Sequence, residues 1–441
     1  MGFLFSTLQL LAALTILVFI HELGHFLAAK AFNMRVDKFY IFFDAWGKKL
    51  FSKTKGETEY GIGWLPLGGY VKIHGMIDES MDKDSIGKEP ADNEFRSKPA
   101  WQRLVVMLGG IVFNIILGLI IFTMIYKVYE KSYLPNEALT NGIYAHELAR
   151  EQGLQTGDKI ISVNGKKIER FKDAMGITAR IGSIMEVERN GKDVIVEIKD
   201  IPFDRMGEPF IEPRNQDVNV AAVLPGMNAE KAGMQAGDQI VSVDGQKIST
   251  FGQFQTLLTK KGNSNINVGV MRDEQLVNLS ADVTEDGKLG FQASSDYSNY
   301  YEFKPYTIGK AMKYSLADGW ETVYTNWKGF GRIAQGKESL RKNIKSPLGM
   351  IELFPSTWNG YAFWKLTGVI SFILAFMNLL PIPALDGGHA TFLIWEMVTR
   401  RKPSDNFLMK AQVAGMIFLL AFMVFAFGND IVNLVSKYFG G

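Results

Sequence analysis

The chain has 441 residues, a formal net charge of +2 at pH 7, no Cys and a mean hydropathy of +0.02. The absence of Cys excludes disulfides, a thiol nucleophile and Cys-ligated zinc. The small net charge and the lack of a phosphate-binding glycine loop argue against a nucleic-acid partner. Long uncharged runs in an otherwise polar chain predict a polytopic α-helical membrane protein, with four transmembrane helices and a large polar insertion.

The first predicted element, residues 1–30, is a transmembrane helix that ends in the sequence His-Glu-Leu-Gly-His. Residues 3–20 carry no charge and are long enough to enter a bilayer as a helix. On a helix, His21 and His25 project from the same face one turn apart, so both imidazoles can bind one Zn²⁺. Glu22 lies about 100° further round the helix and stays free to act as a general base. The motif therefore predicts a zinc hydrolase whose site lies at membrane depth.

Residues 31–100 form a basic loop between the first two predicted spans. Thirteen Lys and Arg side chains lie in residues 30–103, whereas residues 1–20 have none. Because positive residues concentrate on the cytosolic side of membrane proteins, this bias predicts a cytosolic loop and termini that both lie outside. The second transmembrane helix follows at residues 101–127, with Asn114 as its main polar interruption.

A polar insertion follows the second span and contains an internal repeat. Residues 153–168 and 233–248 are identical at ten of sixteen positions and are offset by 80 residues. Each copy reads as a Gly-Asp turn, a β-branched strand, an Asn-Gly or Asp-Gly turn and a second strand. The pattern resembles a tandem of bacterial PDZ domains, at residues 128–215 and 216–298. The repeat therefore predicts two α+β domains of one fold, outside the cytosol.

The insertion leaves two alternatives open. PDZ domains bind a chain end as an added strand, but the loops that would hold its carboxylate are poor in glycine, so groove binding and simple steric filtering are equally favoured. Residues 299–360 have aromatic side chains among basic ones, which predicts an amphipathic helical segment at the outer membrane surface or a helix packed on the second PDZ domain. His146 and Glu147 start a similar run without a second His, and we interpret them as ordinary surface residues.

The third predicted transmembrane helix, residues 361–400, carries a candidate third metal ligand. A catalytic zinc needs three protein ligands and one open position. Two prolines shortly after Asn378 break the helix and present Asp386 at the same cytosol-proximal level as the end of the first span. Asp386 is therefore the predicted ligand; a salt bridge or a plain Asp-Gly turn is the alternative, and His389 is the next candidate. Residues 401–441 form the fourth transmembrane helix.

These motifs, in this order and over essentially the whole chain, resemble the bacterial site-2 proteases, a family of intramembrane zinc metalloproteases. The resemblance rests on the first-span motif, on Gly-Gly-x-x-x-Asn in the second span, on the PDZ pair and on Asn-x-x-Pro-x-Pro-x-x-Asp-Gly in the third span. It implies a membrane-associated β-hairpin on the cytosolic side, within residues 59–74, whose edge pairs with unwound substrate. It also implies Zn²⁺ as the cofactor, His21, His25 and Asp386 as its ligands, Glu22 as the catalytic acid and base, and Asn378, Gly68, Gly69 and Asn114 as substrate contacts.

The resemblance further implies regulated intramembrane proteolysis in a bacterial inner membrane, with the PDZ domains and both termini in the periplasm. The implied substrates are signal-peptide remnants and single-span membrane proteins already trimmed outside, such as the anti-sigma factors of the sigma-E stress response. The PDZ domains would gate their access. Two alternatives belong to other classes: a PDZ-bearing membrane scaffold, and a zinc-binding membrane protein such as a transporter without protease activity. A scaffold without activity would have an incomplete zinc motif, but every residue of the motif is present here. A transporter would have polar residues along a whole path through the membrane, but the ionisable residues of these spans gather at one depth.

Overall fold

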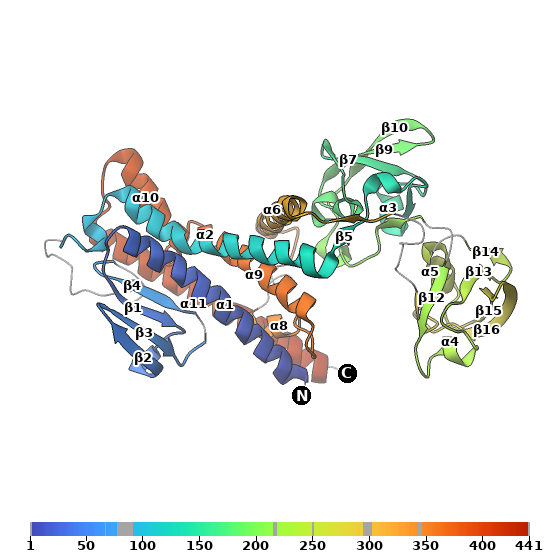
Figure 1. Cartoon of the computed structure of the whole chain (residues 1–441), viewed down its shortest axis with the longest axis horizontal. Coiled ribbons are helices and arrows are strands. Elements are labelled where there is room, and N and C mark those ends of the chain that lie inside the picture. The colour runs from blue at the N-terminus through green and yellow to red at the C-terminus, as the bar shows by residue number, and fades with distance from the viewer. Residues whose placement is uncertain are drawn as a thin grey trace. The chain divides into compact units, whose positions relative to one another are not determined.

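A computed structural model shows the fold and describes residues 2–66, 68–76, 91–214, 218–248, 251–293, 302–339, 341 and 346–439, with side chains up to residue 432. The chain divides into two compact units (Figure 1). The first unit is Met1–Lys131 with Tyr306–Gly441, and the second is Ser132–Pro305. The domain boundaries predicted after residues 215 and 298 lie outside the described residues.

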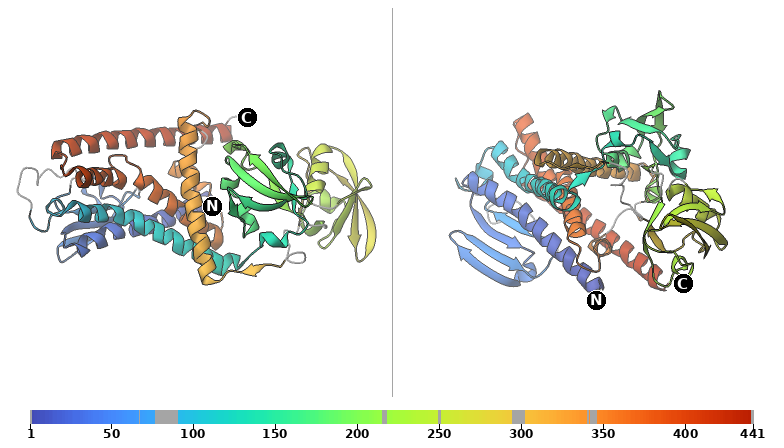
Figure 2. Two further views of the ribbon diagram at one scale, coloured as in Figure 1. Left: turned by 90° about the horizontal axis from the view of Figure 1, so that it is seen from above. Right: turned by 45° about the vertical axis from the view of Figure 1, so that its right-hand side comes forward.

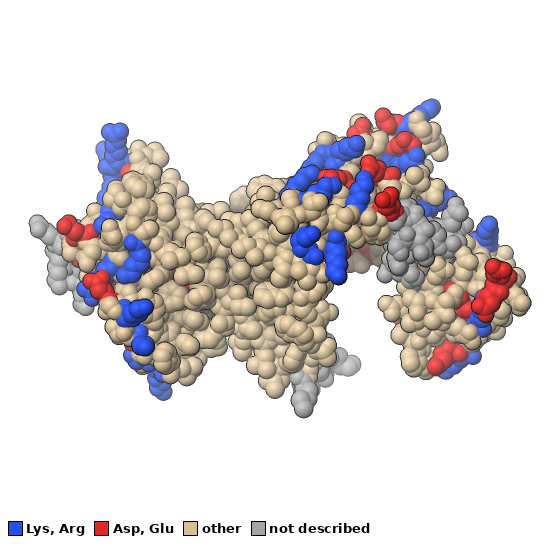
Figure 3. All heavy atoms as spheres, viewed as in Figure 1, with Lys and Arg blue, Asp and Glu red and all other residues tan. Residues whose placement is uncertain are grey.

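Four helices in the described part of the first unit are long and apolar enough to cross a membrane. Each overlaps one of the four predicted spans, which supports the predicted class of polytopic membrane protein. In Figure 3 these helices show a broad belt without charged side chains, as expected for surface that contacts lipid. They are α1 (Gly2–Ala31), α2 (Ala100–Met124, continued by a π-helical turn at Ile125–Glu130), α9 (Gly360–Leu379) and α11 (Asp405–Phe439).

The third predicted span is interrupted at its two prolines, as the sequence predicts. Helix α9 ends at Leu379, and a new helix, α10 (Asp386–Thr399), begins six residues after Leu380 with Asp386 as its first residue. Proline lacks the backbone N–H that a helix interior needs, so Pro381 and Pro383 cannot continue α9. The break turns the chain and places Asp386 at a helix start.

Helix α2 lies at the centre of the first unit, where it packs on α1, α9, α10 and α6 (Ile308–Ala334). Helix α6 runs across the others (Figure 2). Thr307 caps its first turn by accepting a hydrogen bond from the backbone N–H of Lys310. One face of α6 is buried against α2 and α9, and the opposite face exposes an apolar stripe, Ile308, Met312, Leu316, Trp320 and Trp327. A short helix, α8 (Pro347–Ile351), precedes α9.

The region between α1 and α2 contains a four-stranded mixed sheet, in which the consecutive strands β2 and β3 pair antiparallel, whereas the prediction of a β-hairpin within residues 59–74 was wrong. The strand order is β2–β3–β1–β4; β1 is parallel to β3 and antiparallel to β4. The expected hairpin partners, β3 and β4, are separated by β1. Because β1 lies between them and adjacent strands are about 4.8 Å apart, a two-residue hairpin turn cannot join β3 to β4. The strands are β1 (Val36–Ile41), β2 (Lys49–Lys55), β3 (Thr58–Gly63) and β4 (Tyr70–Ile73).

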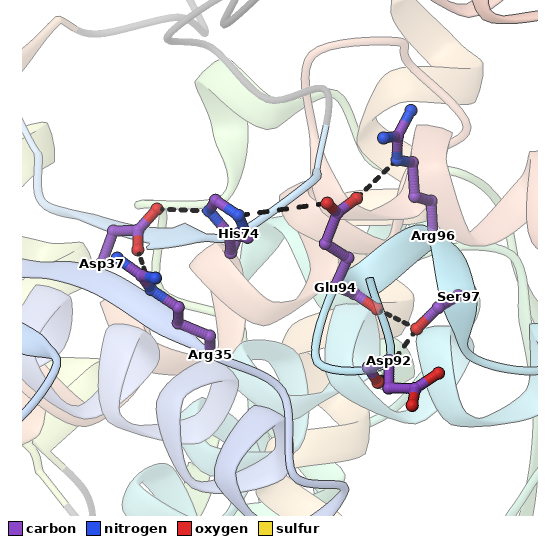
Figure 4. Close-up of polar contacts among 7 residues, drawn as sticks. All are labelled: Arg35, Asp37, His74, Asp92, Glu94, Arg96 and Ser97. Carbon is purple, nitrogen blue, oxygen red and sulfur yellow. Dashed lines mark hydrogen bonds and ion pairs between the residues drawn. The ribbon is translucent and has the colours of Figure 1, made fainter. Parts of the chain in front are cut away.

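A polar network fastens the end of β4 to the segment that leads into α2 (Figure 4). His74 follows β4, and its Nδ1 lies 2.9 Å from Oδ2 of Asp37 on β1. Its Nε2 lies 4.0 Å from Oε1 of Glu94, whose carboxylate accepts a hydrogen bond from Nε of Arg96. The backbone N–H of Phe95 also donates to the carbonyl of His74. These contacts hold β4 in place beside the helices.

The second unit contains two copies of one fold, each with its own apolar core. Strand β7 begins at Lys159 and β13 at Gln239, which is the sequence offset of 80 residues. Antiparallel strands in the order β10–β9–β7 in the first copy correspond to β16–β15–β13 in the second. Helix α5 (Phe251–Lys260) of the second copy is replaced by two 3₁₀ turns, at Phe171–Ala174 and Ile177–Ala179, in the first.

The remaining elements of the second unit show the same correspondence. The first copy has β6 (Ile143–Ala145), α3 (Glu147–Glu151), β7 (Lys159–Val163), β8 (Lys166–Lys167), β9 (Ser183–Arg189), β10 (Lys192–Ile198) and β11 (Ile211–Pro213). The second copy has β12 (Val218–Val223), α4 (Asn228–Lys231), β13 (Gln239–Val243), β14 (Gln246–Lys247), β15 (Asn265–Arg272), β16 (Gln275–Asp282) and β17 (Phe291–Ala293). The ends of the unit meet, because β5 (Ser132–Tyr133) pairs with β18 (Lys304–Pro305).

Candidate metal centre

Two histidines on α1 and one aspartate on α10 bring three potential metal ligands together. Nε2 of His21 lies 3.2 Å from Nε2 of His25. Oδ2 of Asp386 lies 3.1 Å from Nε2 of His21 and 3.3 Å from Nε2 of His25. Among the residues that the structure describes, these three are the one group of His, Asp or Glu side chains arranged to hold a metal ion. The structure therefore brings together the residues that the sequence predicts as ligands.

The spacing of these atoms fits a tetrahedral zinc site. A tetrahedron with bonds of about 2.0–2.1 Å has edges of about 3.3–3.4 Å, close to the three separations. Oδ2 of Asp386 is buried and has no partner with hydrogen-bond geometry, although both imidazole nitrogens lie near it. A buried carboxylate oxygen in this situation costs free energy unless a cation binds it. Two nitrogens and one carboxylate oxygen are also a donor set that zinc accepts.

Glu22 borders the same cavity as the three ligand residues. The cavity has a volume of about 500 Å³, and Glu22 itself is only 8% exposed. Strand β4 lines one part of the cavity, and residues from the end of α9, from α10 and from α11 line other parts. Because β4 is the edge strand of its sheet, one row of its backbone N–H and C=O groups has no strand partner among the described residues. The cavity therefore joins a carboxylate, a possible metal site and the edge strand of a sheet.

Glycines let α2 approach α1 closely at the two histidines. A Cβ atom on Gly24 would lie 2.3 Å from the carbonyl oxygen of Gly109. A Cβ atom on Gly110 would lie 2.4 Å from Nε2 of His25 and 2.5 Å from Cε1 of His21. Real Cβ atoms do not approach other atoms this closely, and small residues are what permits such helix contacts in membranes. Gly109 and Gly110 of the second span therefore allow α2 to pack directly against Gly24 and the two histidines.

The predicted substrate contacts divide into two groups. Asn378 and Gly69 line the cavity, and a Cβ atom on Gly69 would lie 2.7 Å from the carbonyl oxygen of Tyr40 and 3.2 Å from Cγ of Glu22. Gly68 is not among the lining residues. Asn114 is fully buried behind the cluster, and its amide faces Nδ1 of His21. Asn114 is not among the described residues that line the cavity, and its contact with substrate stays a prediction.

Several residues that the sequence did not single out also line the cavity. Asp44 bridges two of them, since its carboxylate accepts hydrogen bonds from Nζ of Lys38 at 3.0 Å and from the hydroxyl of Tyr70 at 2.9 Å. Burial alone would raise the pKa of Asp44, but the hydrogen bonds from Lys38 and Tyr70 outweigh it and hold the pKa below its usual value. No local pattern marks these residues, because they meet only through the sheet.

Gln412 of α11 is a further cavity residue that was missed. It is 4% exposed, and its side chain has no hydrogen bond to another residue that the structure describes. A polar amide side chain within the mostly apolar fourth span was the feature of the sequence that could have identified Gln412 as a candidate site residue. The side-chain amide of Gln412 can hydrogen-bond a peptide backbone in both directions, since its carbonyl oxygen accepts and its NH₂ group donates.

Comparison with known proteins identifies the family. The model of the family described as peptidase family M50 matches residues 9–422. The chain belongs to peptidase family M50. Protease RseP of Yersinia pestis is 27% identical over 98% of this chain and 100% of its own length. A protein of Fusobacterium nucleatum, named as a candidate zinc metalloprotease, is 29% identical over 96% of this chain and 97% of its own length. A Rickettsia conorii protein named in the same way is 28% identical over 98% of this chain and 99% of its own length.

Membership of peptidase family M50 confirms two predictions from the sequence. The resemblance to the site-2 proteases is correct, and the chain is a metalloprotease. The match begins before the His-Glu-Leu-Gly-His motif and extends beyond Asp386, so it includes every residue of the candidate centre. The roles of the individual residues stay predictions.

Proposed function

We propose that this M50 peptidase is an intramembrane zinc endopeptidase, in which His21, His25 and Asp386 bind the ion and Glu22 is the catalytic acid and base. The observation that carries this proposal is the triangle of ligand atoms beside Glu22, in a cavity bordered by helices apolar enough to cross a membrane. The names of the relatives, which describe zinc metalloproteases, support the choice of metal.

The residues of the site divide the reaction between them. When bound, zinc supplies Lewis-acid polarisation of a carbonyl group. Glu22 takes the proton of the attacking water and returns it to the amine that leaves. The buried position of Glu22 on α1, one residue from His21, keeps its carboxylate beside the reacting groups while bulk water is excluded.

The substrate enters the site as an extended strand. A transmembrane helix hides its peptide bonds in its own hydrogen bonds, so cleavage requires an unwound segment whose backbone groups find new partners. Strand β4 is an edge strand, and its outward backbone N–H and C=O groups can hydrogen-bond an added substrate strand. Asn378, Gly69 and Gln412 line the same cavity and would hold the strand against the metal. The four-stranded sheet thus takes the role that the resemblance gave to a hairpin edge.

The substrates in this proposal are signal-peptide remnants and single-span membrane proteins, of the anti-sigma-factor type, that have already been trimmed outside. The enzyme lies in the bacterial inner membrane, with both termini and the second unit on the periplasmic side. Each copy in the second unit is a PDZ domain, and the pair gates access to the site. The repeated α+β fold and the absence of Lys and Arg from residues 1–20 support this arrangement. The exposed apolar stripe of α6 supports its placement at the outer membrane surface.

Substitution of Glu22 by Gln tests the function. The full-length E22Q variant in vesicles should bind one zinc per chain, as the wild type does, while cleavage of a model single-span substrate falls by about 10²–10⁴-fold. Glu147→Gln is a matched control, because Glu147 also follows a His but lies exposed in the second unit. The E147Q variant should cleave at the wild-type rate. Loss of zinc from E22Q, or cleavage by it near the wild-type rate, would contradict the role of Glu22.

A further inference from the structure

Both histidines of the candidate metal centre contact α2 through Nδ1, the ring nitrogen that does not face Asp386. Nδ1 of His25 lies 2.8 Å from the carbonyl oxygen of Val106, and Nδ1 of His21 lies 3.3 Å from Nδ2 of Asn114. A carbonyl oxygen can only accept a hydrogen bond, so Nδ1 of His25 carries a proton and Nε2 of a neutral ring has its lone pair free. One turn of α1 and two turns of α2 therefore hold both rings.

The partner of His21 differs in kind from the partner of His25. Asn114 has an acceptor, Oδ1, and a donor group, Nδ2, and rotation of the amide by 180° exchanges their positions. With Nδ2 beside the ring, Nδ1 of His21 accepts and Nε2 carries the proton that lies near Oδ2 of Asp386. With Oδ1 beside the ring, Nδ1 donates and Nε2 offers its lone pair. Asn114 can thus support either tautomer of His21.

Only one of these arrangements suits a bound metal. A metal ion takes the lone pair of Nε2, so the ring proton must be on Nδ1 and needs an acceptor. Asn114 is fully buried, and its Oδ1 has no hydrogen-bond partner where it stands. No water can replace the amide at this position unless the helices separate. The acceptor that His21 needs is therefore already next to the ring.

The backbone of Asn114 has a contact with α9 that does not involve the side-chain amide. The hydroxyl of Ser371 on α9 donates a hydrogen bond to the backbone carbonyl of Asn114 at 2.7 Å. This contact joins α2 to α9 whatever the side chain at position 114 is. The side chain of Asn114 and its backbone thus have separate partners, which allows their roles to be tested separately.

We propose that Asn114 is a positioning residue for the metal site: its amide rotates when the ion binds, so that Oδ1 accepts the Nδ1 proton of His21 and directs Nε2 at the ion. This inference rests on the proposed zinc function. It assigns to the second-span asparagine a role in metal affinity. An Asp at position 114 could only accept, so it would favour the metal-bound tautomer. A Leu, of similar size, could do neither.

Competition with a chelator tests the proposal on the full-length protein in detergent. The zinc affinity of Asn114→Leu should fall by about 10- to 100-fold, as is typical when the orienting partner of a histidine ligand is lost. Asn114→Asp should keep at least the wild-type affinity. Ser371→Ala removes the neighbouring hydrogen bond to the backbone, so it is the matched control and should bind zinc as the wild type does. The zinc-dependent rise in melting temperature should follow the same order.

Two results would overturn the proposal: wild-type zinc affinity in Asn114→Leu, or equal weakening in the Leu and Asp variants. The Asp variant decides the outcome even if the Leu variant does not fold, because weakened binding in folded Asn114→Asp contradicts the acceptor role. Failure of the proposed zinc function is recognised separately, since the wild type itself would then bind no zinc.

Discussion

Gly110 faces the imidazole of His25 so closely that a Cβ atom on Gly110 would lie 2.4 Å from Nε2. The contact leaves no room for a methyl group, since Cε1 of His21 would also lie only 2.5 Å away. The two histidines can therefore occupy these positions only because residue 110 of α2 has no side chain.

Substitution of Gly110 by Ala should move α2 away from the histidines. Overpacking of this kind costs about 1–3 kcal/mol, and the displaced rings should bind zinc more weakly. Thermal unfolding and chelator competition on the full-length protein would measure both effects. Gly331→Ala on α6 is the control, because no heavy atom lies within 4 Å of its Cβ position and Ala is the better helix former. A Gly110→Ala variant with wild-type stability and zinc affinity would show that the contact is not tight.

Asp386→Ala should weaken zinc binding as well as abolish cleavage. Oδ2 of Asp386 completes the triangle with the two imidazoles, and two imidazoles alone are an incomplete ligand set. Zinc content after dialysis against a weak chelator is the measurement. Full zinc occupancy and activity in Asp386→Asn would exclude Asp386 as a ligand, and His389, which also lines the cavity, would be tested next.

Asp44 should make the cavity sensitive to acid. The pKa of its carboxyl group lies below the usual value, so the hydrogen bonds from Lys38 and Tyr70 stabilise the folded state above the ordinary pKa of an aspartate and are lost as the pH falls below it. The melting temperature of the wild type should therefore drop below about pH 4. Asp44→Asn should be less stable at neutral pH and should lack this step. Equal pH profiles for the two proteins would contradict the prediction.

Removal of the second unit should broaden the range of substrates. The backbone N–H of Tyr306 donates to the carbonyl of Lys131 at 2.9 Å, so a short linker can replace residues 132–305 without moving the helices. If the two copies exclude bulky substrates, the deletion variant should keep its zinc and should cleave an untrimmed single-span protein that the full chain ignores. Groove recognition by PDZ domains predicts slower cleavage of trimmed substrates instead. Unchanged rates for both substrates would exclude both forms of gating.

Local patterns predicted the parts of this protein that depend on one stretch of chain. The i, i+4 spacing of His21 and His25, the helix break before Asp386 and the 80-residue repeat are all readable within single elements or by self-comparison. The order of the four-stranded sheet was not predictable in this way, because β1 pairs with β3 in parallel and with β4 on its other side. The contact between the Asn114 amide and His21 was not predictable for a related reason: only helix packing reveals it.

The origin of the proposed ligands from α1 and α10 also affects how the enzyme is made. The nascent chain presents His21 and His25 early, but Asp386 emerges only after the second unit, α6 and α9 have been synthesised. At about 5–20 residues per second, this interval lasts roughly 20–70 s. During this time the first two spans cannot assemble the ligand triangle. If Asp386 is a ligand as proposed, a chain that ends before α10 has an incomplete metal site, and we expect such incomplete copies of the protease to be unable to cut neighbouring membrane proteins.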